Sequence, residues 1–455
     1  MTTVTMSHWP ARALTPLLGT TVGGVLRAAA WRAPDRIALI DPGRREWTYG
    51  ELRDEAERVA RGLLTRFEPG EPVAVWAGNG PDWVLLEFAA GLAGLTLVTV
   101  NPAYQAEELA HVLGHSGAAG VFLRSGAQAG ILAQVRDRLP RLREVLTLGE
   151  WPAGDGPLPE VDPASPAQIL YTSGTTGRPK AAVLTHRGLT NNARLAAEAI
   201  GLRAGDVMVN PMPYFHVAGC ALITLGLVQT LGTHVVLARF DPGRMLELTE
   251  RYRGTVIGGV PTMLTALLAA AARAPRDLSS LRLALAGGAT VPCGTVGEIC
   301  TRGYLVMDGY LGDPEATAAA IDADGWLHTG DLGTMDARGY VRVTGRVKEM
   351  IIRGGENIYP RELEELLFRH PKVGEVAVVG LPDQKWGEEV GAFIRPAPGA
   401  TISKDELFLY MREHLAPHKT PRQWFMVEAF PLTGSGKIQK FKLRESFVKG
   451  ELTAL

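Results

Sequence analysis

Hydroxyl and glycine residues are concentrated between Tyr171 and Lys180, in the segment Tyr-Thr-Ser-Gly-Thr-Thr-Gly-Arg-Pro-Lys. Residues 168–171 precede it, and we expect them to form a strand. Glycine lets backbone N–H groups turn toward an anion, hydroxyls add donors, and the lysine adds a mobile positive charge. It is not a Walker loop, because no Gly-Lys-Ser/Thr is present. We predict that a polyphosphate contacts Thr172, Ser173, Gly174, Thr175, Thr176, Gly177 and Lys180.

This segment resembles the phosphate-loop signature of the adenylate-forming, or AMP-binding, superfamily. The superfamily includes acyl-CoA synthetases, peptide-synthetase adenylation domains and luciferases. One departure is Ala181, where the family usually has glycine after Pro-Lys. The resemblance implies an ATP-dependent ligase that forms acyl-CoA, AMP and pyrophosphate from a fatty or related carboxylic acid through an acyl-adenylate. It also implies ATP, Mg²⁺ and coenzyme A as cofactors and substrates, with Lys180 as a catalytic residue.

A second segment, Asn210–Gly219, reads Asn-Pro-Met-Pro-Tyr-Phe-His-Val-Ala-Gly and is similar to the family motif that lines the acyl pocket. The resemblance places His216 beside the carboxylate that is activated and makes it a catalytic residue. A single histidine after aromatic residues is, taken alone, more often a residue of the core. The role of His216 therefore depends on the resemblance.

Two further segments resemble the nucleotide side of the family site. Gly325–Asp331 reads Gly-Trp-Leu-His-Thr-Gly-Asp, and the family uses the matching Asp331 to accept hydrogen bonds from both ribose hydroxyls. Gly345–Glu349 resembles the hinge between the two family domains. The resemblance implies that Arg346 contacts the ribose and that Lys348 is the hinge residue.

The C-terminal part contains two glycine-rich loops with implied roles. Gly354 and Gly355 match the loop that forms the pantetheine tunnel, where the absence of side chains lets backbone pass close to a thin substrate arm. The segment Pro-Leu-Thr-Gly-Ser-Gly-Lys ends at Lys437 and resembles the loop whose lysine reaches the α-phosphate. Lys437 is thus the third catalytic residue that the resemblance implies.

Helix and strand signals alternate along the first half of the chain, which favours a layered α/β architecture with mainly parallel strands. The pattern changes near residue 345 to that of a small α+β unit. We therefore predict an α/β fold with two domains. These are a large N-terminal AMP-binding domain over residues 1–345 and a small, mobile C-terminal domain over residues 346–455.

The family pattern is interrupted at Pro292–Cys293. In the family, the segment Gly287–Pro292 leads into a long helix, a strand and a Tyr-Gly-x-Thr-Glu motif. In this sequence Pro292 runs directly into residues that resemble a section well downstream, and no Tyr-Gly-x-Thr-Glu occurs. The N-terminal domain is therefore predicted to lack a segment after about residue 292. In the family that segment supplies the Thr and Glu that contact phosphate and Mg²⁺.

Composition excludes several other classes of protein. The 47 basic and 48 acidic residues balance, so electrostatics do not favour nucleic acid as a partner. The cysteines, Cys220, Cys293 and Cys300, are too few for a disulfide framework and are expected to be reduced thiols in a cytoplasmic protein. No transmembrane segment is expected, no residue is assigned to a metal, and homo-oligomerisation stays open.

Two alternatives to a free-CoA ligase remain from the sequence. The missing segment favours a catalytically impaired or inactive relic of such an enzyme, with reduced stability, since an apolar face would lose its cover. Transfer of the acyl group to a carrier protein is the other alternative. The Gly354–Gly355 loop and the absence of an attached carrier domain favour free CoA.

Overall fold

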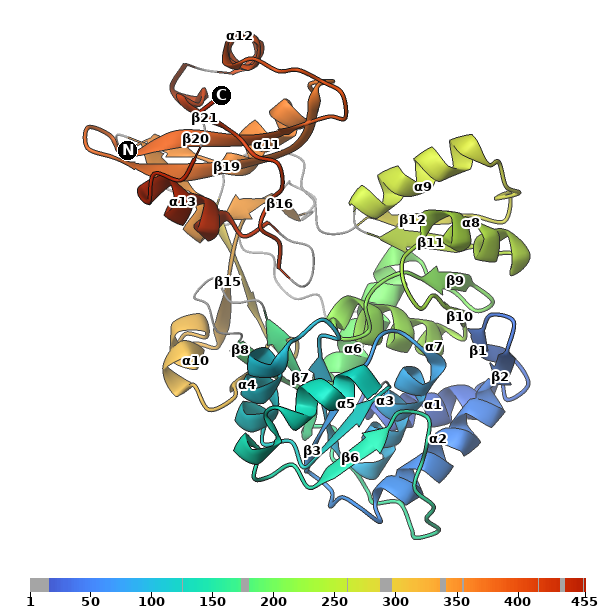
Figure 1. The fold of residues 1–455 in the computed structure, drawn as a ribbon. Helices are drawn as coiled ribbons and strands as arrows, with labels where there is room; N and C mark the ends of the chain where they lie inside the picture. Colours follow the sequence, from blue (N-terminus) through green and yellow to red (C-terminus); the bar gives the residue numbers. More distant parts are fainter. Residues whose placement is uncertain are drawn as a thin grey trace. The chain divides into compact units, whose positions relative to one another are not determined.

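The computed structural model describes residues 16–124, 126–172, 180–259, 261–286, 297–335, 341–353, 356–415, 417–433, 438–452 and 454–455. They form two compact units (Figure 1). The larger unit lies within residues 13–289 and 302–326, and the smaller within residues 1–12, 290–301 and 327–455. The boundaries of these units differ from the boundary between the predicted domains, residues 1–345 and 346–455. That domain boundary stays a prediction.

A seven-stranded sheet occupies one part of the larger unit. Its strands are β3 (Pro72–Trp76), β4 (Thr96–Val100), β5 (Gly120–Leu123), β6 (Glu144–Thr147), β7 (Pro166–Thr172), β8 (Lys180–Thr185) and β14 (Gly309–Tyr310). The strand order is β14-β8-β7-β4-β3-β5-β6. Strands β3 to β7 are parallel, whereas β8 is antiparallel to β7. Every residue of β4 and β5 is buried, as is typical of parallel strands covered on both faces.

Helices cover this sheet on both faces (Figure 1). They are α1 (Val22–Arg32), α2 (Tyr49–Leu63), α3 (Pro81–Ala93), α4 (Ala106–Ser116), α5 (Gly126–Ala133) and the short η1 (Arg136–Arg138). Helix α3 begins with proline in its first turn and ends at Gly94, whose φ of 71° is the left-handed cap that glycine favours. It is buried from Trp83 to Ala93, so its apolar sequence forms the centre of the core.

A six-stranded sheet completes the larger unit. Its strands are β1 (Ile37–Asp41), β2 (Arg45–Thr48), β9 (Val207–Asn210), β10 (Thr233–Val236), β11 (Val256–Gly259) and β12 (Leu283–Ala286), in the order β12-β11-β9-β10-β1-β2. Within the described ranges, β12 pairs with β11 alone and is an edge strand. The remaining helices of the unit are α6 (His186–Ile200), the π-helix η2 (Ala218–Leu225), α7 (Gly226–Thr230), α8 (Pro242–Arg251), α9 (Pro261–Arg273) and α10 (Pro314–Ala320).

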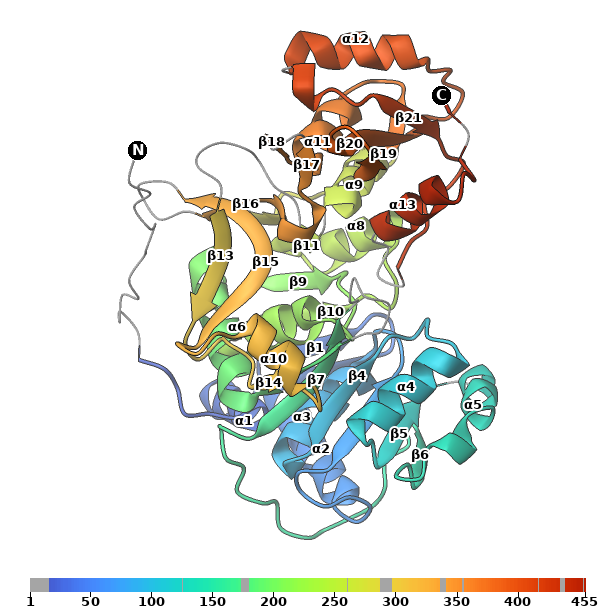
Figure 2. The same cartoon turned by 90° about the vertical axis from the view of Figure 1, so that its left-hand side faces the viewer.

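The smaller unit contains two sheets. One has the order β13-β15-β16, with β13 (Gly297–Arg302), β15 (Trp326–Met335) and β16 (Val341–Arg346), which Figure 2 shows side by side. The other has the order β18-β17-β20-β19, with β21 beside β20; its strands are β17 (Ile351–Arg353), β18 (Glu356–Ile358), β19 (Val373–Asp383), β20 (Gly387–Pro396) and β21 (Gln423–Met426). The helices are η3 (Val347–Glu349), α11 (Pro360–Phe368), α12 (Lys404–His414), η4 (Pro417–Lys419) and α13 (Lys440–Val448).

Both units agree with the predicted fold class. The larger unit is layered α/β with mainly parallel strands, and the smaller unit is α+β with a long antiparallel pair, β19 and β20. Among the helices that the structure describes, none combines the length and the apolar character that a membrane crossing requires.

Candidate active site

The predicted phosphate loop connects two strands of the seven-stranded sheet. β7 ends at Thr172 and β8 begins at Lys180, and these two residues are partners in the antiparallel register. The loop leaves the sheet at the carboxyl end of β7, which is parallel to β4, and open α/β sheets bind ligands at such ends. The other predicted phosphate contacts lie outside the described residues: Ser173, Gly174, Thr175, Thr176 and Gly177.

Lys180 packs against an aromatic ring at the end of the loop. Its Nζ lies 4.8 Å from the centroid of the Tyr310 ring. The antiparallel pairing of β14 with β8 brings the ring there, because Tyr310 is the register partner of Ala182. An ammonium over an aromatic face is attracted by the ring electrons. Tyr310 therefore positions Lys180, and no local signal in the sequence pointed to it.

The segment Asn210–Gly219 is held in place by Asn79. The Asn79 side-chain amide donates to the Met212 carbonyl oxygen at 2.9 Å, and its oxygen accepts from the Tyr214 N–H at 2.9 Å. One residue thereby fixes two points of the backbone immediately before His216. Sequence reasoning missed Asn79, which follows strand β3.

A buried contact between Tyr214 and His234 also supports this segment. The Tyr214 hydroxyl oxygen lies 2.8 Å from His234 Nε2. Burial lowers the pKa of His234 to about 3, so its imidazole is neutral at physiological pH. The pair is therefore a structural support and carries no charge into the site.

His216 itself is exposed. Its Nδ1 accepts a hydrogen bond from the Ala218 N–H at 3.2 Å. In the neutral ring this bond assigns the proton to Nε2, which makes Nε2–H a donor. A donor of this kind suits a carboxylate oxygen.

The His216 segment and the phosphate loop lie at the same end of the seven-stranded sheet. Thr99 on β4 donates from its hydroxyl to the Phe215 carbonyl oxygen at 2.9 Å. Thr99 is also the register partner of Leu170 on β7, shortly before that strand ends at Thr172. The structure thus places the His216 segment against β4, the neighbour of the strand that leads into the predicted phosphate loop.

Asp331 and Arg346 form the second group of predicted site residues, in the smaller unit. They are register partners on β15 and β16, and Arg346 Nε lies 3.1 Å from Asp331 Oδ1. Both side chains are accessible, with 34% of Asp331 and 52% of Arg346 exposed. Lys348, the predicted hinge, follows in the exposed 3₁₀ turn η3. The two predicted ribose contacts are therefore adjacent and reachable.

Three predicted residues, Gly354, Gly355 and Lys437, lie outside the described residues. The segments that flank them are described. β17 and β18 are antiparallel partners on either side of the glycine pair. Leu432 pairs with Ile438 in an isolated antiparallel bridge on either side of the segment that contains Lys437.

Lys440 links this last segment to the residues next to the hinge. Its Nζ lies 3.0 Å from a carboxylate oxygen of Glu349, beside Lys348, and 2.7 Å from one of Glu364. Burial lowers the pKa of Lys440, but the two carboxylates outweigh it and the net pKa is raised. The only sequence signal for a role of Lys440 is that it follows the candidate catalytic Lys437 by three residues.

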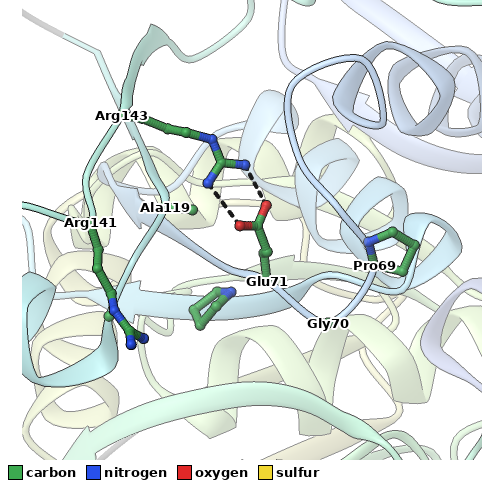
Figure 3. A pocket seen from close by; sticks show the side chains of 8 residues that line it. Pro69, Gly70, Glu71, Ala119, Arg141 and Arg143 are labelled. Carbon is green, nitrogen blue, oxygen red and sulfur yellow. Dashed lines mark hydrogen bonds and ion pairs between the residues drawn. The ribbon is translucent and has the colours of Figure 1, made fainter.

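A surface pocket elsewhere on the larger unit does not coincide with the predicted site (Figure 3). Arg143 Nη1 donates to Glu71 Oε1 at 2.8 Å within it. The pocket lies at the amino ends of parallel strands. Its lining includes the residues that immediately precede β3, β5 and β6, which are Glu71, Ala119 and Arg143. Ligands of open α/β sheets bind at the carboxyl ends, where the phosphate loop lies.

Comparison with known proteins identifies the family. Residues 26–292 match the model for the AMP-binding enzyme, and residues 362–437 match the AMP-binding enzyme C-terminal domain. A 3-[(3aS,4S,7aS)-7a-methyl-1,5-dioxo-octahydro-1H-inden-4-yl]propanoyl:CoA ligase of Mycobacterium tuberculosis is 37% identical, with 93% of this chain and 98% of the relative covered. The mitochondrial medium-chain acyl-CoA ligase ACSF2 of Rattus norvegicus is 33% identical, with 94% and 88% covered.

A solved structure agrees with these matches. The o-succinylbenzoate CoA synthetase MenE of Bacillus subtilis, in complex with its acyl-adenylate intermediate, superposes with a TM-score of 0.84. It is 27% identical, and 94% of this chain and 99% of that chain are covered. These matches extend over most of both chains, and the relatives are named as ligases or synthetases. They give no support to the alternative that this chain is an inactive relic.

The comparisons also agree with the predicted gap. The match to the AMP-binding enzyme model ends at residue 292, the last residue before the predicted deletion. The alignment with the mycobacterial ligase runs over 504 positions and that with the rat ligase over 539, both more than the 455 residues of this chain. Residues of both relatives therefore have no counterpart here, although most of each relative is matched. The chain belongs to the AMP-binding enzyme family, and the relatives named here are CoA ligases or synthetases.

Proposed function

We propose that this chain converts a fatty or related carboxylic acid to its CoA thioester, with ATP cleaved to AMP and pyrophosphate. The observation that carries the proposal is the strand register that places the His216 segment beside the strand leading into the phosphate loop. A carboxylate held by His216 would meet the phosphates of ATP at that end of the sheet. An enzyme that adenylates acids needs this juxtaposition.

In the first step the carboxylate oxygen bonds to the α-phosphorus of ATP, and pyrophosphate leaves with the electrons of the broken P–O bond. Lys180 and the loop donors, Thr172 to Gly177, stabilise negative charge on the phosphates, and Lys437 does so at the α-phosphate. Asp331 accepts hydrogen bonds from the ribose hydroxyls. Its ion pair with Arg346 orients the carboxylate.

In the second step the CoA thiolate attacks the acyl carbonyl, and AMP leaves. The predicted C-terminal domain, residues 346–455, would turn about Lys348, which withdraws Lys437 and brings in the Gly354–Gly355 loop for the pantetheine arm. The Lys437 loop would serve adenylate formation and the Gly354–Gly355 loop thioester formation. Because the two loops enter the site in turn, the two reactions occur one after the other. Mg²⁺ is proposed as the ion that accompanies the ATP phosphates. The sequence has no Tyr-Gly-x-Thr-Glu carboxylate to hold it, so we assign it no protein ligand and no step.

The acyl group is proposed from the chemistry of the relatives' names. One names a medium-chain acyl group and another a propanoyl group on a fused ring system. Both are largely apolar acids, so an apolar carboxylic acid is the substrate class we propose. The expectation of a cytoplasmic enzyme, drawn from its few cysteines, also stays a proposal.

The test measures acyl-CoA and AMP by mass spectrometry after purified protein of confirmed mass is incubated with ATP, Mg²⁺, CoA and a panel of apolar acids. We expect equimolar acyl-CoA and AMP from at least one acid. Lys437→Ala should lower the rate by about 100-fold or more, as expected for loss of a group that stabilises transition-state charge. Lys449→Ala, an exposed lysine of the same region, is the matched control and should leave the rate unchanged.

Two outcomes would contradict the proposal. One is the absence of acyl-CoA with every acid, although the protein is folded. The other is product formation at the same rate in Lys437→Ala as in the unmodified protein.

A further inference from the structure

Three side chains with different metal-binding atoms meet on the sheet β13-β15-β16. Glu298 and Cys300 lie two residues apart on β13, so both point to the same face. His328 lies on β15, and Figure 2 shows β13 and β15 side by side. One ligand atom from each of the three residues lies within 4.8 Å of the other two.

The distances between these atoms suit a single tetrahedral ion. His328 Nδ1 lies 3.0 Å from Glu298 Oε2 and 3.6 Å from Cys300 Sγ. Zinc bonds of about 2.0–2.3 Å at tetrahedral angles separate ligand atoms by about 3.3–3.7 Å. Both distances from His328 therefore lie within a few tenths of an ångström of this range, and the ligand atoms of Glu298 and Cys300 are at most 4.8 Å apart.

The carboxylate is already oriented for this role. Glu298 Oε1 accepts a hydrogen bond from the Gly330 N–H at 3.0 Å, which fixes the group and directs Oε2 toward His328. The Thr329 hydroxyl donates to the Ile299 carbonyl oxygen at 2.7 Å and ties the same two strands together. Outer hydrogen bonds of this kind hold metal ligands in place in known sites.

We propose that Glu298, Cys300 and His328 bind a divalent transition metal ion of the zinc class. The thiolate, imidazole and carboxylate donors match the ligands that zinc takes in proteins, and a water molecule would complete the tetrahedron. All three side chains are partly exposed, so an ion can reach them. The site is independent of the ligase activity and stands or fails without it.

Binding should stabilise the smaller unit. The ion would bridge β13 and β15 just before Asp331, and a ligand that binds the folded state alone raises the melting temperature with its concentration. Affinity should fall with acidity, because the thiol and the imidazole must lose their protons to bind.

The experiment titrates metal-free protein with Zn²⁺ and with Co²⁺, in a Cys293→Ser background so that this thiol cannot contribute. We expect one equivalent to bind, with the visible bands of tetrahedral Co²⁺ and a thiolate-to-cobalt charge-transfer band. Cys300→Ser should abolish the charge-transfer band. His328→Gln should weaken Zn²⁺ binding by about 100-fold or more, since even loss of an outer partner costs about 10–100-fold.

His414→Gln is the matched control, because His414 is an exposed histidine of the same unit, on α12. It should bind Zn²⁺ as tightly as the parent. A readout that needs no site variant is protection of Cys300 from alkylation by bound Zn²⁺, mapped by peptide mass spectrometry. Absence of stoichiometric binding, equal binding in Cys300→Ser, or alkylation of Cys300 at the same rate with and without Zn²⁺ would each overturn the proposal.

Discussion

The centre of the seven-stranded sheet and the edge of the six-stranded sheet differ in how completely they are covered. In the seven-stranded sheet, β4 is buried at every residue and α3 along nearly its whole length. In the six-stranded sheet, the edge strand β12 has an exposed Ala284 between two half-buried leucines, and Leu268 on the neighbouring α9 is 74% exposed. The family match ends just after β12.

The predicted site segments and the predicted deletion lie on different strands. The strand that leads into the phosphate loop, β7, belongs to the seven-stranded sheet, whereas the His216 segment follows β9 of the six-stranded sheet. The predicted deletion, after residue 292, follows β12, the edge strand of the six-stranded sheet. We therefore expect a stable framework around β7 and a less stable edge at β12.

The largest effect should come from the covered sheet. Phe88 on α3 has no exposed surface, and Phe88→Ala should lower the free energy of unfolding by about 3–5 kcal/mol through lost burial and a cavity. Leu268→Ala, on the uncovered side, should change it by less than about 0.5 kcal/mol. Denaturant unfolding of both variants measures the two changes in the free energy of unfolding. Equal losses would contradict the expected difference between the two regions.

A buried carboxyl group should give the covered sheet an unusual pH dependence. Burial raises the pKa of Glu87 to about 8, and Gln168 Nε2 donates to it at 2.7 Å. The folded protein therefore holds a proton that the unfolded chain releases above its ordinary pKa of 4.5. Stability is full below that value and falls as pH rises toward about 8, by about 1.4 kcal/mol per pH unit at most.

Glu87→Gln should remove this pH dependence, because an amide does not titrate. Unfolding experiments at several pH values between 5 and 8 compare the two slopes. Glu46→Gln, which changes an exposed carboxylate, is the control and should keep the slope of the parent. A slope in Glu87→Gln equal to that of the parent would show that another group titrates.

A carboxylate at the edge sheet should respond to pH with the opposite sign. Asp206 is buried and pairs with Arg282, directly before β12, and it accepts from Thr255 at 2.8 Å. Burial raises the pKa of Asp206, but Arg282 and its hydrogen bonds outweigh this and the net pKa is lowered. Its contribution to stability is therefore present above the unfolded value of 3.8 and is lost as pH falls through the folded value.

Arg282→Met should cost about 2 kcal/mol at neutral pH, less than a fully buried pair because Arg282 is partly exposed. The cost should shrink in acid. The control is Arg276→Met, whose partner Glu250 is exposed to a similar degree as Arg276, and it should cost less than about 0.5 kcal/mol. Equal costs for the two variants would mean that Asp206 does not anchor β12.

The smallest effect concerns β12, which pairs with β11 alone among the described residues. Edge strands with unpaired backbone groups promote association, and a lysine on such a strand opposes it. Ala284→Lys should slow aggregation on warming, measured by light scattering, while stability changes by less than about 0.5 kcal/mol. Ala272→Lys, an exposed site on α9, adds the same charge and should not slow it. Equal slowing by both would indicate a charge effect alone.

Sequence reasoning predicted the α/β class and the strands around the phosphate loop because apolar runs and glycine clusters are local signals. It could not supply the contacts that join distant segments. Asn79 and Thr99 hold the His216 segment, and Tyr310 packs on Lys180, yet none has a local pattern that announces a partner far along the chain. The trio of Glu298, Cys300 and His328 likewise appears only when β13 and β15 pair.

The central claim is that the chain adenylates an acid although its family segment after residue 292 is missing. Acid-dependent exchange of radiolabelled pyrophosphate into ATP tests it most directly, because this exchange needs only the first step. We predict exchange that requires the acid, proceeds without CoA and falls to background in Lys180→Ala and Lys437→Ala. Folded protein of confirmed mass that shows no acid-dependent exchange with any apolar acid would contradict the claim.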